Sequence, residues 1–332
     1  MISCFFLEQK QIYAPGCSKI TAMRIKYSNE DKIFNIHTEQ IPYLSIDMLD
    51  KLGVPNLFTT RYISYDPERK EGVLGLRTAF MKDDDVNEAA PVITEMRDRL
   101  ARQLGSSIEH ECITDQRHTN FVHVVSPEDL GPVWPDRKPL HRQYVDGMVT
   151  DIPGALLTVF GGDCPTVYLA DPVRRVIGLV HAGWKGTLGR IPAVAIARMV
   201  IRFGCDPADI YAAIGPGVCR DCYEMGDEVY DAFAAEWSPE DADAIFSRYP
   251  AKDKDGNEIP GGKYHLDLRE ANRMTLLRAG VPEGNISVSN VCTMCNVNTF
   301  YSYRAGRMEN EQCAMIVNTW EEPNYESYCC SR

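Results

Sequence analysis

The sequence predicts an α+β fold built on mixed β-sheets, and three observations indicate it. Short β-rich runs and longer segments with helical spacing follow one another without a strict strand–helix–strand rhythm, which disfavours a doubly wound sheet. The chain has 332 residues, of which 44% are hydrophobic and 25% charged, so it is long enough to bury a large core. The sequence also contains no internal repeat and no low-complexity linker, which favours one domain.

The expected domain covers residues 24–320. Residues 1–23 are predicted to be a poorly ordered extension, because their apolar start, Met1–Phe6, has no basic leader and is soon interrupted by charged residues. Residues 321–332 are predicted to be a C-terminal tail. Without an export signal, the 12 cysteines are expected to be reduced thiols of a cytoplasmic protein.

The charge balance excludes some classes of partner. The formal net charge is −12, from 35 basic and 47 acidic side chains, and this acidity disfavours a general nucleic-acid or anionic-membrane binder. The longest uncharged apolar stretch, residues 152–162, is far shorter than the roughly 20 residues that span a bilayer. We therefore expect neither a nucleic acid nor a membrane as a partner.

The pattern of apolar residues places the expected elements in order. Helical spacing predicts helices over 84–104, 188–203, 226–236 and 266–279, three of which stop at a glycine. Residues 250–263 are charged and rich in turn formers, which predicts a surface loop. Strands are expected within 24–65 and 113–125, and at 155–160, 166–170, 176–181, 210–214, 286–291 and 313–318.

The segment between residues 161 and 186 carries the most informative pattern. A turn centred on Pro172 and Val173 predicts a hairpin in which Cys164 and His181 are cross-strand partners. Their Cβ atoms are then about 5 Å apart on one sheet face. Two such side chains can bind one zinc ion, because Zn–S and Zn–N bonds are about 2.3 Å and 2.0–2.1 Å long.

The best candidate for a third ligand is His118, which lies in a polar cluster between apolar runs. Three protein ligands with an open position are typical of a catalytic zinc site. A buried cysteine and two hydrogen-bonded histidines are the ordinary alternative.

The chain after His181 reads Ala-Gly-Trp-Lys-Gly and leads into a helix. Free backbone N–H groups between Gly183 and Gly186, together with the charge of Lys185, indicate an anion site. The alternative is that the two glycines only permit a tight bend.

These blocks together resemble the YfiH-type family, known as laccase-domain or multicopper polyphenol oxidase proteins and as purine nucleoside phosphorylases. The similarity covers about residues 50–318. The matching segments are 116–118, 146–150, 162–164, 181–186, 213–216, 222–226, 266–268, 292–293 and 300–304.

The resemblance implies an α/β/β/α layering of mixed sheets and a zinc ion held by His118, Cys164 and His181. It implies phosphorolysis of adenosine, inosine and methylthioadenosine, with deamination of adenosine at the same site. Purine nucleosides and inorganic phosphate are then the partners. Arg61 matches an arginine near the pocket of the family, and Arg304 lies in another matching segment.

For phosphorolysis, we expect Gly183, Lys185, Gly186 and Arg61 to hold the phosphate. Arg304 is a further candidate, with structural packing as its alternative. For deamination, zinc deaminases use a carboxylate as proton shuttle, and Asp163 is the candidate. The alternative for Asp163 is a carboxylate that caps a turn.

Three positions depart from the family pattern. Gly75 stands where an asparagine is usual, Met96 stands where an asparagine often precedes an arginine, and Gln312 stands where an arginine is usual. The three proposed metal ligands match the pattern. Copper is disfavoured as the cofactor, because multicopper oxidases bind largely through His-x-His pairs and none occurs among the seven histidines.

Two other functions remain open from the residues. A metal-independent cysteine hydrolase requires the same proximity, with Cys164 as nucleophile and His181 as base. A non-enzymatic interaction module stabilised by zinc could use the pairs Cys219/Cys222 and Cys292/Cys295. The 69 residues between these pairs, 223–291, greatly exceed the roughly 15–20 of a zinc ribbon, which favours ordinary thiols.

Overall fold

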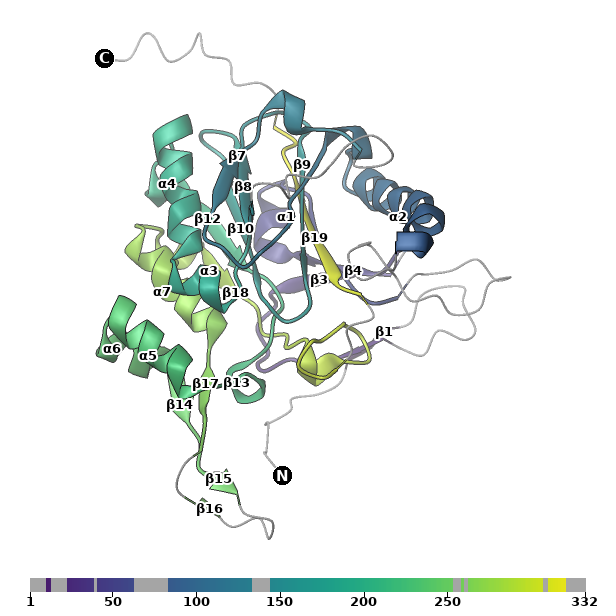
Figure 1. Ribbon diagram of the computed structural model, residues 1–332. Helices are drawn as coiled ribbons and strands as arrows, with labels where there is room; N and C mark the ends of the chain where they lie inside the picture. The colour runs from purple at the N-terminus through teal and green to yellow at the C-terminus, as the bar shows by residue number, and fades with distance from the viewer. Residues whose placement is uncertain are drawn as a thin grey trace, which may run out of the picture.

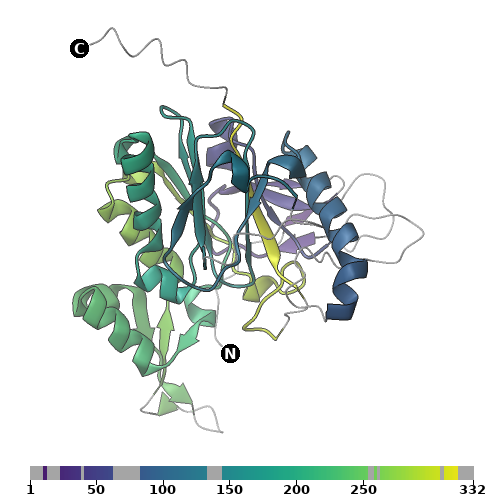
Figure 2. The ribbon, with the colours of Figure 1, turned by 45° about the horizontal axis from the view of Figure 1, so that its top comes forward.

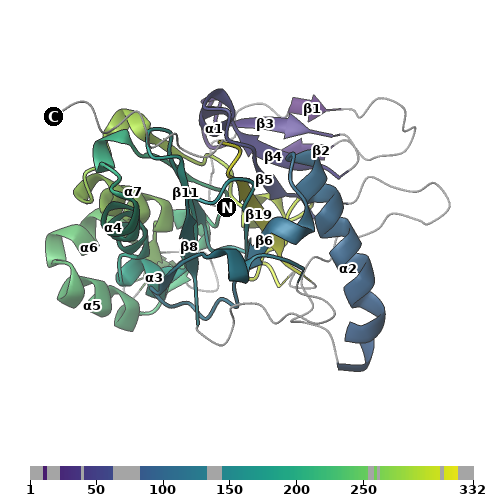
Figure 3. The same ribbon diagram turned by 90° about the horizontal axis from the view of Figure 1, so that it is seen from above.

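The computed structural model describes residues 10–12, 23–38, 41–62, 83–132, 144–252, 258–259, 262–306 and 310–320. Within these residues, two six-stranded sheets lie face to face, and helices cover their outer sides (Figure 1 and Figure 3). The α/β/β/α layering of mixed sheets implied by the resemblance is therefore confirmed.

Sheet A has the order β18-β12-β10-β11-β8-β7, and sheet B has the order β3-β4-β5-β19-β9-β6. Both are mixed, because three neighbouring pairs, β12–β18, β7–β8 and β6–β9, run parallel and the others antiparallel. The strands of sheet A are β7 (Val122–Val124), β8 (Gly147–Thr150), β10 (Thr166–Asp171), β11 (Val176–His181), β12 (Tyr211–Ile214) and β18 (Ile286–Val288). Those of sheet B are β3 (Phe34–His37), β4 (Tyr43–Ile46), β5 (Asn56–Thr59), β6 (Glu111–Ile113), β9 (Leu156–Gly161) and β19 (Gln312–Val317).

Strand β10 contributes side chains to the core on each face of its sheet. Successive side chains of a strand point to opposite faces. Tyr168 and Ala170 accordingly join the core between the two sheets, whereas Val167 and Leu169 join the core under the outer helices. All four are fully buried, which explains the continuous apolar run.

The outer helices are amphipathic, as their spacing predicts. Sheet A is covered by α4 (Ile191–Phe203) and α7 (Leu268–Arg278), and sheet B by α2 (Asp83–Gln103). The predicted helix over 188–203 is divided, because Arg190 adopts a left-handed conformation with φ 54° and separates α3 (Trp184–Leu188) from α4. Gly204, with φ 69°, ends α4 as predicted. Across the described residues, every helix is too short or too polar to span a bilayer.

The predicted register of the β10–β11 hairpin is wrong by two residues. His181 pairs with Thr166 and not with Cys164. The reason is the turn, where the Asp171 side chain accepts hydrogen bonds from the backbone N–H groups of Val173 and Arg174, both at 2.9 Å. This centres the loop one residue later than predicted. A shift of two residues in the pairing preserves the face on which each side chain lies.

A small lobe beside α3 has its own apolar cluster (Figure 2). Helices α5 (Asp227–Glu236) and α6 (Pro239–Ile245) pack on a sheet of β13 (Glu224–Met225), β17 (Tyr264–Leu266) and β14 (Phe246–Arg248). Helix α6 was not predicted, although Ser238 caps it by accepting the Asp241 N–H at 3.1 Å.

The predicted loop over 250–263 contains a two-stranded ribbon of β15 (Ala251–Lys252) and β16 (Glu258–Ile259). In the predicted extension, β1 (Lys10–Ile12) pairs with β2 (Met23–Ile25). The rest of that extension and the predicted tail 321–332 lie outside the described residues. The remaining short elements are α1 (Asp47–Lys51) and the 3-10 turns η2 (Ile108–His110), η3 (Pro127–Asp129), η5 (Pro207–Asp209), η6 (Arg220–Cys222), η7 (Glu283–Asn285) and η8 (Met294–Asn296).

Candidate metal centre

The three predicted ligands, His118, Cys164 and His181, converge on one point. One ligand atom from each lies within 4.8 Å of the other two. The Nε2 atom of His118 is 3.9 Å from the Sγ atom of Cys164, and the two imidazole rings meet edge to face with centroids 5.0 Å apart. The sequence-based prediction that these side chains meet is therefore confirmed.

Two of the ligands lie where the chain passes from sheet B to sheet A. His118 belongs to the crossing from β6 to β7, and Cys164 to the crossing from β9 to β10. His181 is the last residue of β11, in sheet A. The centre thus lies at the junction of the two sheets.

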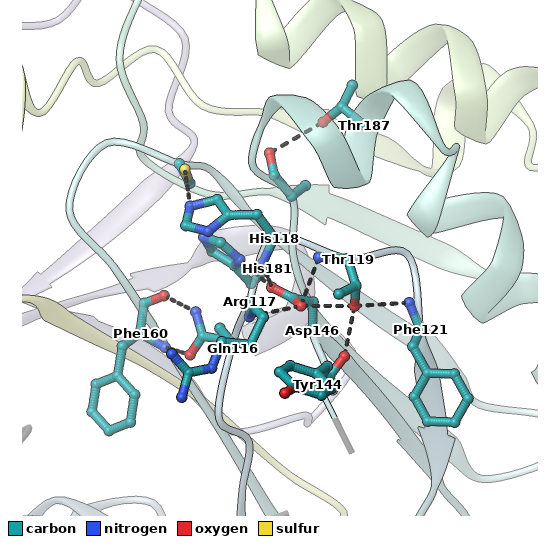
Figure 4. A network of polar contacts seen from close by, with 12 residues as sticks. Gln116, Arg117, His118, Thr119, Phe121, Tyr144, Asp146, Phe160, His181 and Thr187 are labelled. Atoms are coloured by element: carbon teal, nitrogen blue, oxygen red, sulfur yellow. Dashed lines mark hydrogen bonds and ion pairs between the residues drawn. The ribbon is translucent and has the colours of Figure 1, made fainter. Parts of the chain in front are cut away.

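Asp146 organises the loop that carries His118 (Figure 4). This fully buried carboxylate precedes β8 and accepts hydrogen bonds from the backbone N–H groups of Arg117, His118 and Thr119, at 3.0, 2.9 and 2.8 Å. Such a concave run of N–H groups around one anion is favourable. His118 takes φ 59° in this turn, an uncommon conformation for a residue other than glycine, which the three hydrogen bonds stabilise.

The same carboxylate orients His181. Its Oδ1 atom lies 2.8 Å from Nδ1 of His181, so that Nδ1 carries the proton and Nε2 is available to a metal. A carboxylate behind a ligand histidine is typical of zinc sites. Asp146 was not among the predicted site residues, although it begins the segment 146–150 that matches the family pattern.

Gln116 fixes the start of the same loop. Its side-chain amide accepts the backbone N–H of Phe160 at 2.9 Å and also donates to the carbonyl of that residue. The loop therefore remains attached to β9 beyond the end of β6.

The charges of the centre favour the ligand form of Cys164. Burial raises the pKa of its thiol, but the neighbouring imidazoles of His181 and His118 outweigh burial and lower the pKa to about 7. Burial lowers the pKa of His181, but the Cys164 thiolate and Asp146 outweigh this and raise the pKa to about 10. The second ring proton, at Nε2, is the one that a bound metal ion would displace. A thiolate is the form that binds metals and also the form that acts as a nucleophile.

The donor set fits zinc. A thiolate sulfur and two imidazole nitrogens are preferred zinc ligands, and three of them leave one position of a tetrahedron for solvent or substrate. His118 is exposed, whereas His181 is 3% exposed, so solvent reaches the centre from the His118 side.

A cavity of about 510 Å³ opens on that side of the centre. It lies between the His118 loop, α3 and α5. The residues lining it are His118, Thr119, Asn120, Lys185, Leu188, Gly189, Ala232, Ala235 and Glu236.

Lys185, Gly183 and Gly186 occupy different positions around the centre. The exposed Lys185 lines the cavity. A Cβ atom on Gly183 would lie 2.7 Å from Cδ2 of His118, and one on Gly186 would lie 2.8 Å from the carbonyl oxygen of Thr119. Both glycines are buried and allow α3 to approach the His118 loop, and their role in anion binding stays a prediction.

Arg61 and Arg304 are not among the residues lining that cavity. The guanidinium of Arg61 donates to the carbonyl of Val297 at 3.0 Å and lies 5.3 Å from the ring centre of Tyr301. The guanidinium of Arg304 lies over the ring of Tyr223, at 4.7 Å. Both therefore have structural contacts, and their role in phosphate binding stays a prediction.

Asp163 is buried, and both of its carboxylate oxygens accept hydrogen bonds. Its Oδ1 accepts the hydroxyl of Thr293 at 2.6 Å, and its Oδ2 accepts the hydroxyl of Ser302 at 3.1 Å and the backbone N–H of Arg304 at 2.7 Å. Burial raises the pKa of this carboxyl. These three donors favour the turn-capping interpretation over the proton shuttle.

The three departures from the family pattern lie apart. Gly75 is outside the described residues. Met96 is half-buried on α2 and packs against the core under that helix. Gln312 is fully buried at the start of β19, where it pairs with Gly161.

The lowered pKa of Cys164 can be tested by the pH dependence of its alkylation. In chelator-treated protein, we expect the rate of Cys164 alkylation by iodoacetamide to rise through pH 7, because the thiolate is the reacting form and forms above its pKa. Added zinc should suppress the reaction. Peptide mass spectrometry measures the rate.

Cys205 is the internal control, because burial raises the pKa of its thiol and should keep it unreactive. A rate for Cys164 that rises only near pH 9 would contradict the described electrostatics.

Comparison with known proteins gives a consistent family likeness. A family model described as multi-copper polyphenol oxidoreductase laccase matches residues 68–318. Adenosine deaminase RL5, from an unknown prokaryotic organism, is 36% identical over 222 residues, which are 67% of this chain and 79% of that protein. Purine nucleoside phosphorylase YlmD of Geobacillus stearothermophilus is 34% identical over 249 residues, 75% of this chain and 84% of that one.

A solved structure supports the same likeness. The crystal structure of the hypothetical protein YfiH from Bacillus licheniformis superposes with a TM-score of 0.71 at 29% sequence identity. The match covers 85% of this chain and 98% of that chain.

Proposed function

We infer that this chain, which belongs to the multi-copper polyphenol oxidoreductase laccase family, is a zinc-dependent purine nucleoside phosphorylase that also deaminates adenosine. The proposed substrates are adenosine, inosine and methylthioadenosine, together with inorganic phosphate. The observation that carries the proposal is the convergence of His118, Cys164 and His181 beside an open cavity, with Asp146 behind them.

The ligands support zinc rather than a set of coppers. The described residues contain two groups of three or more potential ligands. One group consists of four cysteines, and the other contains two imidazoles, those of His118 and His181. Multicopper chemistry needs more imidazoles than these two groups supply. The proposal is therefore a single catalytic zinc, for which a thiolate and two imidazoles are suitable donors.

The chemistry that zinc supplies when bound at such a centre is Lewis-acid activation of water or of a polar substrate atom. The protein contributes the rest. Asp146 holds His181 in the tautomer whose Nε2 faces the centre, and it holds the His118 loop by its backbone. Because these groups are fixed before the substrate arrives, little reorganisation is needed during the reaction.

The proposed phosphate site is at Lys185. Its ammonium group lines the same cavity as His118 and offers a positive charge to an anion there. The Glu236 carboxylate also lines the cavity, but it pairs with Arg190 at 3.1 Å, which offsets its negative charge. In phosphorolysis, a phosphate oxygen bonds to the anomeric carbon of the ribose while the bond to the purine nitrogen breaks. Orientation of the two substrates is the main contribution of such a site.

For deamination, the proposed reaction bonds a water oxygen to C6 of adenosine while the C6–N bond to the amino group breaks, which gives inosine and ammonia. The shuttle expected at Asp163 would require its carboxylate to leave Thr293, Ser302 and the backbone of Arg304. The contacts support a positioning role for Asp163, because it directly precedes Cys164 and is held by these segments.

An assay with inosine tests the function. Protein of known zinc content should release hypoxanthine in the presence of phosphate and not in its absence, and it should convert adenosine to inosine without phosphate. Cys164→Ser should lower both activities by at least about 100-fold, because a zinc ligand is lost. Cys205→Ser, at a buried cysteine outside the centre, is the matched control.

The outcomes separate the competing functions. Stoichiometric zinc without any nucleoside turnover would refute the proposal. Turnover that survives zinc removal but is abolished by alkylation of Cys164 would support the cysteine hydrolase instead.

A further inference from the structure

A second group of potential ligands lies outside the centre described above. The sulfur atoms of Cys219, Cys222, Cys292 and Cys295 all lie within 4.8 Å of one another. They come from two loops that are far apart in the sequence, one before β13 and one after β18. The long intervening segment, which favours ordinary thiols by the spacing of zinc ribbons, therefore does not prevent the two pairs from meeting. We propose that these four cysteines, the tetracysteine site, bind a second zinc ion with a structural role.

The distances between the sulfur atoms fit one shared metal ion. Tetrahedral coordination with Zn–S bonds of about 2.3 Å places neighbouring sulfurs about 3.8 Å apart. Cys222 Sγ and Cys295 Sγ are 3.5 Å apart, and no pair exceeds 4.8 Å. A disulfide needs sulfurs about 2.05 Å apart, so Cys222 and Cys295 are not bonded to each other, and all four cysteines are free thiols. Four sulfur donors around one point indicate zinc among the common divalent ions, and they leave no open position.

The backbone around the site prepares the cysteines to act together. Cys219 begins the turn η6, and its partner Cys222 ends it; Cys292 and Cys295 flank the start of η8 in a similar way. The backbone N–H groups of Cys219 and Cys295 both point at Sγ of Cys292, at 3.2 and 3.4 Å. Hydrogen bonds to a sulfur stabilise its thiolate form, as outer contacts of metal ligands do.

Burial distinguishes this group from ordinary core cysteines. Cys112 and Cys313 are 1% and 0% exposed and pack among apolar side chains. In the tetracysteine site, three of the four thiols are only half-buried, and each faces other sulfurs. Weak thiol hydrogen bonds offer little reason to gather four such groups, whereas a shared cation does.

The tetracysteine site is connected to the segment that carries Cys164. Val218, next to Cys219, donates its N–H to the carbonyl of Asp163 at 2.8 Å. Thr293, next to Cys292, donates its hydroxyl to the carboxylate of Asp163 at 2.6 Å. Both loops of the site therefore hold the residue that directly precedes Cys164. A metal that joins the two loops stabilises the fold and positions Cys164 from behind.

The metal content of the whole protein tests this inference independently of its reaction. Native mass spectrometry of the full chain should show two zinc ions. Cys164→Ser should retain one, and the double variant Cys222→Ser/Cys295→Ser should also retain one. Cys205→Ser should retain two, as the matched single-cysteine control. In the Cys164→Ser background, Co²⁺ added to metal-free protein should give the sulfur-to-metal charge-transfer absorption of a tetrathiolate site.

The wild-type protein and Cys164→Ser keep the test decisive even where the double variant does not fold. One zinc ion in the wild-type protein and none in Cys164→Ser would overturn the inference. Two disulfides among the four cysteines in freshly purified protein would also overturn it. Loss of nucleoside turnover with both zinc ions present contradicts only the proposed function. Where the inference holds, the double variant should also unfold at a lower temperature than the control.

Discussion

Replacing Asp146 with asparagine is expected to lower the zinc affinity of the His118–Cys164–His181 centre by about 10- to 100-fold, the usual effect of losing a partner behind a ligand. Asparagine has the same shape as aspartate. Its NH₂ group, however, would face backbone N–H groups whose hydrogen bonds the carboxylate accepts in the wild-type protein. His181 also loses the acceptor that fixes its tautomer. Leaving these buried groups unsatisfied should cost on the order of 3 kcal/mol of folding free energy.

Zinc titration with a competing chelator and denaturant unfolding measure the two effects. Asp129→Asn provides a matched control, because Asp129 pairs with His123 at 2.9 Å and accepts the backbone N–H of Ser126, but lies outside the centre. The control should retain the zinc affinity of the wild-type protein. Wild-type affinity in Asp146→Asn would show that the carboxylate does not support the centre.

Gly183→Ala is expected to reduce nucleoside turnover by about 100-fold, the scale of a 1 Å misplacement in an active site. The added methyl group would lie 2.7 Å from Cδ2 of His118 and 3.0 Å from Sγ of Cys164, so two ligands must move apart. The backbone of Gly183, with φ −66° and ψ 167°, suits alanine, and the effect is therefore steric.

Turnover and zinc content of the purified variant check this prediction. Gly284→Ala is the control, because its added Cβ meets no atom within 4 Å and its φ is not in the left-handed region. Only Gly183→Ala should lose activity. Equal activity in both variants would place the reacting atoms away from this pair of ligands.

Elements with strong local signals were predictable from the sequence. Helix α2 begins and ends within one residue of the predicted range, because its apolar residues recur with helical spacing and Gly105 takes φ 77° two residues after its end. The split between α3 and α4 was not predicted, although local signals for it are present. Gly189 ends α3, and Pro192 lies in the first turn of α4, with Arg190 at φ 54° between the two helices.

The convergence of His118, Cys164 and His181 was predicted through an incorrect detail. The hairpin was expected to place Cys164 opposite His181, whereas Thr166 occupies that position. The three ligands still meet, because the error of two residues retains the face of the strand and the turn after β9 returns Cys164 to the end of β11. His118 could not be placed from local spacing, since its position depends on hydrogen bonds to Asp146.

The tetracysteine site marks the limit of arguments from spacing. The rule that ligand pairs lie about 15–20 residues apart describes small zinc domains whose metal organises a single loop. Here the intervening residues fold into the small lobe and α7, and the parallel contact between Gly217 and Cys292 brings the two pairs together. Only the tertiary fold contains this information.

The position of the metal centre at two chain crossings has a consequence for stability. His118 and Cys164 lie in segments that connect sheet B to sheet A, and His181 is the last residue of a strand of sheet A. An ion bound by all three opposes any sliding of one layer against the other, and by mass action its binding free energy adds to the stability of the packed layers. Removal of the metal should therefore lower the unfolding temperature of the protein, and of core variants such as Tyr168→Phe, although Tyr168 touches none of the ligands.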